Sequence, residues 1–189
     1  MYCIAEKVGS AFQNPRTQFF NVDTDSEIAF GMENQAVPQS QLRLRVAQTA
    51  RTLHIEDLLD RSIFALSGGE KQKIAFASVY AMAPEINLLD EPSSNLDISS
   101  IGALREHLKL IKSQGKTVVI AEHRLYYLMD VADRILCLEN GRIAGGITPQ
   151  TMPSSSVLPG KRQNRRRLDA RAVPAHSGGA AAGDGTAGH

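Results

Sequence analysis

Short apolar runs alternate with segments of helical periodicity along much of the chain. Four apolar runs bounded by turn residues predict buried strands. They cover residues 8–12, 86–89, 117–121 and 135–138. Asn140-Gly141 after the last run is a strong hairpin signal that leads into Arg142 and Ile143. Between the second and third run, apolar residues recur at helical spacing from Ile101 to Ile111, and Gly115 follows where a glycine commonly ends a helix. Strands that alternate with helices in this order predict an α/β fold in which helices cover a parallel sheet.

The stretch from residue 24 to residue 82 is predicted to be mostly helical. Thr24 and Glu27 have the spacing of a capping box, and Ser67 and Glu70 repeat that spacing before a second helix. Between them, apolar residues recur at helical spacing at Leu42, Val46, Ala50 and Leu53. We therefore expect residues 24–82 to form a helical subdomain that is inserted into the sheet or flanks it.

A different kind of sequence begins near residue 150. Residues 150–189 hold six basic and two acidic residues, and residues 177–189 are nearly all Gly, Ala and small polar residues. Such a composition buries too little apolar surface to offset the entropy of ordering. We expect one folded domain over residues 1–149 and a disordered, basic, Gly- and Ala-rich tail over residues 150–189. A patch for nucleic acid or acidic lipid at residues 165–167 is the alternative for this tail.

Charge and cysteine content exclude several classes of protein. The 189 residues carry 21 Lys and Arg against 20 Asp and Glu, and the part before residue 150 is mildly acidic. That balance argues against a dedicated nucleic-acid binder. Two cysteines cannot build a disulfide framework, and no apolar stretch is long enough to cross a bilayer. The first residues lack the pattern of a signal peptide, so the expected location is the cytoplasm.

The sequence Leu66-Ser67-Gly68-Gly69-Glu70 marks the start of a predicted helix. A serine cap followed by two glycines leaves backbone N–H groups uncovered at the positive end of the helix, where phosphate binds readily. A plain capped helix after a loop is the alternative interpretation.

Asp90 and Glu91 follow the predicted strand over residues 86–89, at the sheet edge where α/β proteins place their ligands. Asp90 has the chemistry to hold Mg²⁺, and Glu91 has the chemistry of a general base toward water. The alternative is an exposed acidic loop. His123 follows the next strand, and a neutral imidazole there can position water or donate to a phosphate oxygen.

Together these segments resemble the nucleotide-binding domain of ABC ATPases. The resemblance rests on LSGGEKQ, NLLDEP, SSNLD and VVIAEHR, in that order and spacing. It implies a partial P-loop-NTPase-like α/β domain that uses ATP and Mg²⁺ and pairs with a second ABC ATPase subunit, as a homo- or heterodimer. It also implies a role for each matching residue. The catalytic residues are Glu91 and His123, the metal ligands are Asp90 and Gln13, and the nucleotide-binding residues are Gln13, Ser67, Gly68, Gly69, Glu70 and Asp97.

The segment GSAFQNPRTQFF is similar to the ATPase components of energy-coupling-factor transporters. That similarity implies uptake of a vitamin or a metal ion, and a location on the inner face of the cell membrane against a transmembrane coupling subunit. No nucleic-acid partner is implied. Phe19 and Phe20 are candidates for the contact with that subunit, since paired exposed aromatic residues often mark a partner site. Their alternative role is core packing in the helical subdomain.

The chain departs from the family pattern in two places. Residues 1–189 contain no G-x-x-x-x-G-K-[ST] phosphate-binding loop, because Leu110 stands where Gly115-Lys116-Thr117 would need its first glycine. The family places that loop upstream of the glutamine that matches Gln13, so we expect the first part of the domain to be missing. Asn87 puts an amide inside the strand before Asp90, where the family usually has an aliphatic residue.

Three readings of the function follow. The first is an ATPase subunit, or a fragment of one, that drives small-solute uptake. The second is a catalytically incompetent fragment that acts only by pairing with an intact ATPase subunit. The third is an ABC ATPase outside transport, such as a DNA-repair or ribosome-associated protein. The long coiled-coil or linker insertions of that third class are not visible in the sequence.

Overall fold

The computed structural model describes residues 7–149, and the chain divides into two compact units after Val131. Each unit is described by itself. The disordered tail predicted over residues 150–189 lies outside the described residues, so it stays a prediction.

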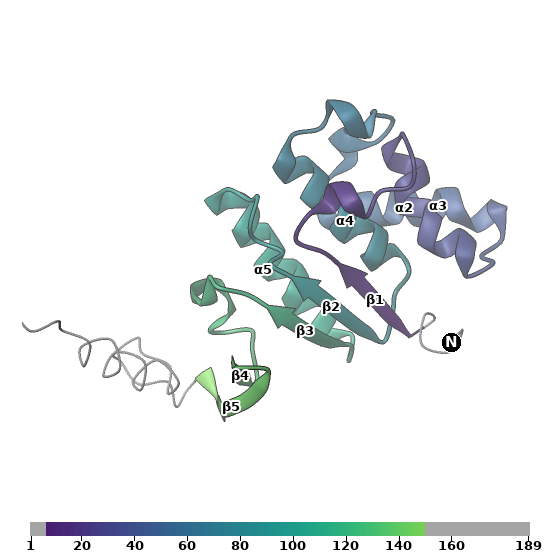
Figure 1. Ribbon diagram of the computed structural model, residues 1–189. Coiled ribbons are helices and arrows are strands. Elements are labelled where there is room, and N and C mark those ends of the chain that lie inside the picture. The colour runs from purple at the N-terminus through teal and green to yellow at the C-terminus, as the bar shows by residue number, and fades with distance from the viewer. Residues whose placement is uncertain (1–6, 150–189) are drawn as a thin grey trace, which may run out of the picture. The chain divides into compact units, whose positions relative to one another are not determined.

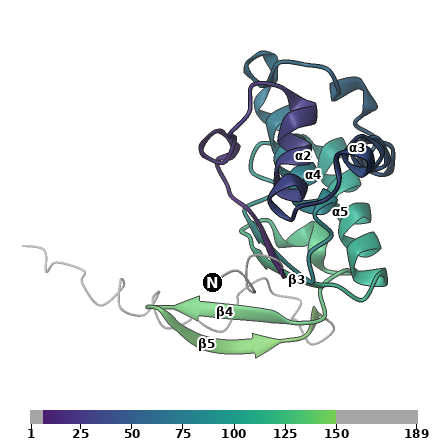
Figure 2. The same cartoon turned by 90° about the vertical axis from the view of Figure 1, so that its right-hand side faces the viewer.

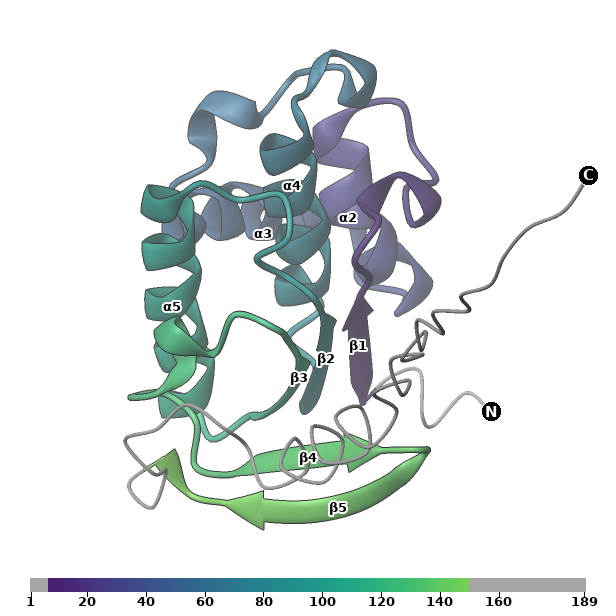
Figure 3. The ribbon, with the colours of Figure 1, turned by 60° about the vertical axis from the view of Figure 1, so that its left-hand side comes forward.

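The first unit is built on a parallel sheet of three strands in the order β1-β2-β3. Its strands are β1 (Val8–Ala11), β2 (Ile86–Asp90) and β3 (Thr117–Ala121). Figure 3 shows them side by side with the same direction. Each of the three matches an apolar run in the sequence, which confirms the parallel sheet. All three carboxyl ends therefore lie along one edge.

Four α-helices accompany this sheet: α2 (Thr24–Asn34), α3 (Gln39–Leu53), α4 (Gly68–Ala81) and α5 (Ile98–Ser113). The helices α2 and α3 pack on each other and on α4, which in turn packs on β1, while α5 packs on β3 (Figures 1 and 2). Residues that point toward the helices are buried, as at Leu89, whereas Leu88 and Val119 on the opposite face are exposed within the described unit. Helices α2, α3 and α4 all lie within residues 24–82, and the grouping of these residues as a subdomain stays a prediction.

The two capping boxes expected from the sequence have different outcomes. At α4 the box is present, with reciprocal hydrogen bonds between Ser67 and Glu70. At α2 the prediction is wrong, because Asp23 is the N-cap and accepts from Ser26 N at 2.8 Å. The Glu27 carboxylate turns instead to the preceding loop and accepts from Phe20 N and Asn21 N. The shorter side chain of Asp23, one residue before Thr24, caps the helix, and the longer side chain of Glu27 bonds to the preceding loop instead.

The second unit contains an antiparallel hairpin of β4 (Ile135–Glu139) and β5 (Arg142–Ile147). Asn140 and Gly141 join the strands, both with positive φ, as a two-residue hairpin turn requires. The hairpin that Asn140-Gly141 predicted is thus confirmed. The expectation that the strand over residues 135–138 also belongs to the parallel sheet is wrong, because within the described residues it pairs only with β5. No helix between residues 7 and 149 is long and apolar enough to span a bilayer.

The close approach of β1 to α4 gives a test of this packing. A Cβ added to Gly9 would lie 2.7 Å from Val79 Cγ1 and 2.9 Å from Pro84 Cγ. We expect Gly9→Ala to lower the free energy of unfolding by about 1–3 kcal/mol, measured by denaturant titration. Gly102 in α5 is the matched control, since nothing lies within 4 Å of its added Cβ. Gly102→Ala should raise stability by about 0.5–1 kcal/mol, and equal effects of the two changes would contradict the packing.

Candidate functional site

Three loops that leave the carboxyl edge of the sheet bring Gln13, Glu91 and His123 together. Gln13 comes two residues after β1, Glu91 directly follows β2, and His123 comes two residues after β3. Because β2 is the central strand, the residue after it lies between the loops that follow its neighbours. The parallel order of the strands thus assembles residues that lie 78 positions apart in the sequence, as Gln13 and Glu91 do.

The Glu91 carboxylate is held at both oxygens. Gln13 Nε2 donates to Glu91 Oε2 at 2.6 Å, and His123 Nε2 lies 2.9 Å from Glu91 Oε1. The side chain of Glu91 is 25% exposed, whereas that of His123 is 87% exposed. A carboxylate that is fixed on two sides yet reachable by solvent suits a group that takes a proton from water.

The backbone of Glu91 adopts a conformation that non-glycine residues rarely adopt, with φ at 42°. Two backbone hydrogen bonds hold it there, from Glu91 N to Ala121 O at 2.9 Å and from Ser94 N to Glu91 O at 3.0 Å. Such strained residues concentrate at functional sites, where the surrounding structure over-determines them. The strained backbone of Glu91 is consistent with a functional requirement on the direction of its carboxylate.

The oxygen donors beside Glu91 fit a magnesium ion. Asp90 ends β2 and is exposed, and Gln13 uses its nitrogen on Glu91, so its Oε1 is not engaged in that contact. Mg²⁺ is usually bound by one or two carboxylates, water and substrate phosphates rather than by a full protein cage. Among residues 7–149, no group of three or more His, Cys, Asp or Glu is placed to hold a metal ion.

A second cluster forms at the N-terminus of α4. Ser67 Oγ accepts from Glu70 N at 3.3 Å, while Glu70 Oε2 accepts from Ser67 N at 2.7 Å and Arg61 Nη1 donates to Glu70 Oε1 at 3.0 Å. The bond from the Ser67 backbone, followed by that from its side chain, lowers the pKa of Glu70 to about 2. Glu70 is therefore charged at neutral pH and serves the helix cap, while the Ser67 hydroxyl keeps its own proton to donate.

The loop over residues 94–97 lies against this helix N-terminus. A Cβ added to Gly69 would be 3.0 Å from Asn95 O, so only a glycine fits comfortably there. Asp97 caps α5, accepting from Ser100 N at 2.7 Å and Ser99 Oγ at 3.0 Å, and these bonds lower its pKa. In this structure Asp97 serves its own helix, and its expected contact with nucleotide stays a prediction.

The two clusters are not bonded to each other. Among the described residues, none of residues 67–70 forms a hydrogen bond or ion pair with Gln13, Glu91 or His123. The sequence-predicted residues therefore form two groups, one around Glu91 and one at the N-terminus of α4.

The sequence did not single out Glu122, which holds His123 in place. Its Oε1 accepts from His123 N at 2.8 Å and from Arg124 N at 3.0 Å. Its Oε2 accepts from the buried Ser93 Oγ at 2.7 Å and from Tyr127 OH at 3.0 Å. These bonds lower the pKa of Glu122, although burial acts in the opposite direction. A carboxylate directly before the histidine of VVIAEHR was the available signal.

Phe19 and Phe20 divide the two roles expected for them. Phe19 is partly buried and packs against the core cluster. Phe20 is 74% exposed and stacks on Phe30, with ring centroids 4.8 Å apart. Core packing therefore accounts for Phe19, and Phe20 retains the exposure that a partner contact needs.

Comparisons with known proteins agree with this arrangement. The family model for ABC transporters matches residues 4–94. An ABC transporter ATP-binding protein of Treponema denticola is 55% identical over 172 residues, covering 89% of this chain and 35% of the relative. One of Pyrococcus furiosus is 37% identical over 136 residues, covering 72% and 52%. The chain thus spans about a third of the length of the Treponema relative and about half of the length of the Pyrococcus relative. The Treponema match also extends into residues 150–189, since residues 1–149 make up less than four fifths of the chain.

Solved structures show the same fold. CbiO1 of Clostridium perfringens, described as part of the ABC transporter complex CbiONQ, superposes with a TM-score of 0.70 at 27% identity, covering 90% of this chain and 66% of that one. The ATP-binding cassette MJ0796, solved as a dimer with ADP and Pi, gives 0.67 at 23% identity, with 77% and 64% covered. The fold and the acidic strand end define a P-loop-NTPase-like α/β protein. Within that class, the chain belongs to the ABC transporter ATP-binding family and contains part of its ATPase domain.

The bonds of Glu122 give a test of the site's support. Glu122→Ala leaves the buried Ser93 hydroxyl and the Tyr127 hydroxyl without their acceptor. We expect the free energy of unfolding to fall by about 2–4 kcal/mol, because each buried unpaired donor costs ~1–3 kcal/mol. Glu139→Ala, on an exposed carboxylate of β4, is the control and should stay within about 0.5 kcal/mol of wild type. A Glu122→Ala protein as stable as this control would show that the four bonds do not hold the loop.

Proposed function

We propose that this chain supplies part of the ATP-binding and ATP-hydrolysing subunit of an ABC transporter of the energy-coupling-factor type. The observation that carries the proposal is the Glu91 carboxylate fixed between Gln13 and His123 at the carboxyl edge of the sheet. The strained Glu91 backbone and the membership of the ABC transporter ATP-binding family support it.

Each residue of the site has a defined task in this proposal. Glu91 orients the attacking water and accepts its proton. His123 uses the single N–H of a neutral imidazole either to hold the Glu91 carboxylate, as in this structure, or to donate to a phosphate oxygen. Asp90 and the Gln13 Oε1 atom hold Mg²⁺, which when bound neutralises charge that develops on the phosphates. General-base assistance of this kind typically contributes ~10²–10⁴-fold to the rate.

The group at the N-terminus of α4 serves a nucleotide held by another subunit. Ser67 and the backbone N–H groups of Gly68 and Gly69 offer donors at the positive end of a helix, which is a favourable place for phosphate. Since these residues form no bond with the Glu91 group, we assign the two groups to different nucleotides. A second ABC ATPase subunit, identical or different, brings the complementary groups.

The partner on the membrane side is a transmembrane coupling subunit, and the cargo is a vitamin or a metal ion. CbiO1, which this chain resembles, is described as part of a transporter complex. Exposed Phe20, supported by its stacking on Phe30, offers the apolar surface that such a contact uses. The corresponding location is the inner face of the cell membrane.

A second candidate function is pairing without catalysis. Residues 1–189 contain no G-x-x-x-x-G-K-[ST] loop, and that loop supplies much of the phosphate binding in such enzymes. In this role the chain contributes Ser67, Gly68 and Gly69 to the nucleotide of an intact subunit, and Glu91 has no phosphate of its own to act on.

A chimera separates the two candidates. The chain would replace its matching segment in the Treponema denticola relative, which supplies the rest of that protein. We expect Glu91→Gln in the chimera to lower ATP turnover by roughly 10²–10⁴-fold, measured as phosphate release, while ATP binding is retained. The reason is that the amide keeps the shape of the side chain and loses the proton acceptor.

Glu33→Gln, on an exposed carboxylate of α2, is the matched control and should leave turnover within about twofold of the parent chimera. Turnover of the Glu91→Gln chimera within a few-fold of the parent would contradict the role of general base. Turnover that is lost with Ser67→Arg and unchanged with Glu91→Gln would favour the pairing role.

A further inference from the structure

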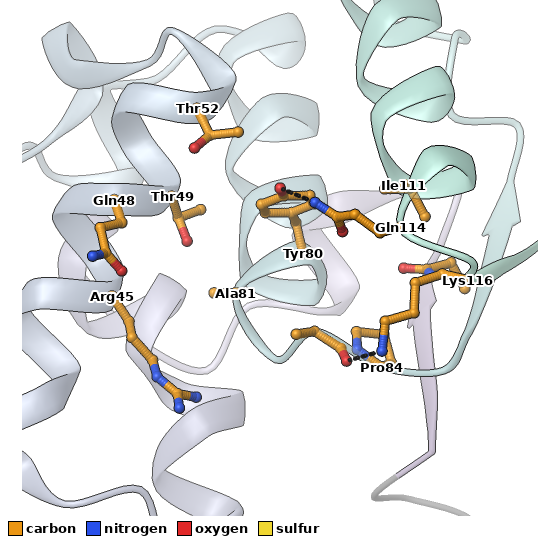
Figure 4. A pocket seen from close by; sticks show the side chains of 12 residues that line it. Arg45, Gln48, Thr49, Thr52, Tyr80, Ala81, Pro84, Ile111, Gln114 and Lys116 are labelled. Carbon is orange, nitrogen blue, oxygen red and sulfur yellow. Dashed lines mark hydrogen bonds between the residues drawn. The ribbon is translucent and has the colours of Figure 1, made fainter.

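A cavity of about 480 Å³ with a mixed polar and apolar lining lies in the first unit, away from the sheet edge that carries Glu91 (Figure 4). Its walls come from the middle of α3, the end of α4 and the end of α5. Asn87 near the start of β2 and Lys116 just before β3 also line it, so the cavity lies toward the opposite ends of the strands from Asp90 and Glu91. Its volume falls in the range of small-molecule sites.

The charge of the cavity has one sign. Arg45 of α3 and Lys116 lie on opposite sides of it, as Figure 4 shows, and none of the described residues that line it is acidic. Within the described residues, Arg45 has no hydrogen bond or ion pair, and Lys116 Nζ donates once, to Ala83 O at 3.3 Å. The neighbouring carboxylate of Glu85 does not line the cavity and is paired with Lys7. Two positive charges thus face the cavity without a counter-charge in its wall.

Asn87 gives the cavity a buried polar wall. It is 3% exposed and lies in β2, the central strand. The structure records one hydrogen bond for its side chain, a long one from Nδ2 to Thr117 O at 3.5 Å. No fully buried side-chain nitrogen or oxygen of the described residues lacks a partner, so Asn87 does not require a ligand for its own stability. Its place in the cavity wall lets the amide offer a further hydrogen bond to a ligand there.

The remaining wall offers both neutral hydrogen-bonding groups and apolar surface. Gln114 Nε2 donates to Tyr80 OH at 3.5 Å across the cavity mouth, and Gln48 and Thr52 of α3 face the same space (Figure 4). The aromatic ring of Tyr80 supplies apolar surface beside its own hydroxyl group. A ligand that satisfies this wall has an anionic group for the cations and a small body with hydroxyl groups.

We propose that this cavity binds a small phosphorylated compound, with Arg45 and Lys116 on its dianionic phosphate and Asn87 on its polar body. The two cations match the charge of a phosphomonoester, whereas a carboxylate needs only one. Arg and Lys are the side chains that proteins use for phosphate. The site is separate from the ATP chemistry proposed above and does not rest on it.

The test is a titration of the ¹⁵N-labelled 189-residue chain with glycerol 1-phosphate, followed by NMR at constant ionic strength. We expect saturable shifts of the side-chain amide signals of Asn87 and Gln114. Arg45→Gln and Lys116→Gln should each weaken binding by roughly tenfold or more, because each removes a charge-assisted hydrogen bond. Asn87→Leu should also weaken binding while leaving the chain folded. Arg43→Gln, an exposed arginine on the same helix, is the matched control and should change the affinity by less than about twofold.

Three outcomes of this titration would overturn the proposal. The first is an equal loss of affinity in Arg43→Gln and Arg45→Gln, which would show attraction by net charge alone. The second is a response confined to the backbone signals of Gly68 and Gly69, which would place the phosphate at the N-terminus of α4. Sodium acetate with the same affinity as glycerol 1-phosphate would equally contradict the choice of a phosphate ester.

A phospholipid headgroup carries the same phosphate chemistry, and vesicles separate that source from a free compound. Co-sedimentation with phosphatidylglycerol vesicles, competed by glycerol 1-phosphate and lost in Arg45→Gln, would assign the site to a lipid headgroup. Binding of glycerol 1-phosphate without co-sedimentation would assign it to a free phosphate ester. Absence of both would reject the site.

Discussion

Parallel pairing of β1, β2 and β3 is the constraint on which the site depends. Parallel strands need long crossover connections, and here the connections are the helical segment before β2 and α5 before β3. The same pairing places the three carboxyl ends on one edge, so Gln13, Glu91 and His123 meet although they are far apart in the sequence. Without that register, Glu91 would be an exposed carboxylate after a strand.

The loop contacts then convert proximity into a defined geometry. Both oxygens of Glu91 are held, and its positive φ is stabilised by backbone bonds to Ala121 and Ser94. Glu122 anchors the following loop to Ser93, so the two loops that carry Glu91 and His123 are tied together at a second point. These contacts among the described residues order the Glu91 group without the help of contacts to a nucleotide. The α4 N-terminus is equally preformed, through its own capping box and the packing of Gly69 on Asn95.

Local sequence patterns predicted the positions of the helices and strands well, and the pairing of the strands less well. The strands of the parallel sheet, the helix α5 with its cap at Asp97, and the capping box of α4 all follow from periodicity and cap chemistry. The N-cap of α2 is Asp23, one residue before the predicted Thr24. Both side chains are suitable for an N-cap, so they compete for the position. The hairpin of β4 and β5 follows from the turn signal at Asn140-Gly141, whereas its separation from the parallel sheet depends on contacts that the local pattern does not encode.

The site shows the same division. Gln13, Glu91 and His123 were predictable because each lies within two residues of a strand end and matches a motif of the family. The roles of Glu122, which bonds to Ser93 and Tyr127, and of Asn87, which lines a cationic cavity, depend on neighbours distant in the sequence. A polar residue inside a strand, or directly before a motif, stands out in the sequence, but its role follows only from its neighbours in the structure.

In this chain the Glu91 group and the N-terminus of α4 form ordered half-sites whose phosphate cradle comes from outside residues 1–189. The decisive experiment is isothermal titration of the purified 189-residue chain with ATP and Mg²⁺, together with an assay of phosphate release. We expect neither micromolar affinity nor turnover, since no G-x-x-x-x-G-K-[ST] segment in residues 1–189 supplies the P-loop amides and lysine. Micromolar ATP affinity with magnesium-dependent turnover that is lost in Asp90→Ala would contradict it.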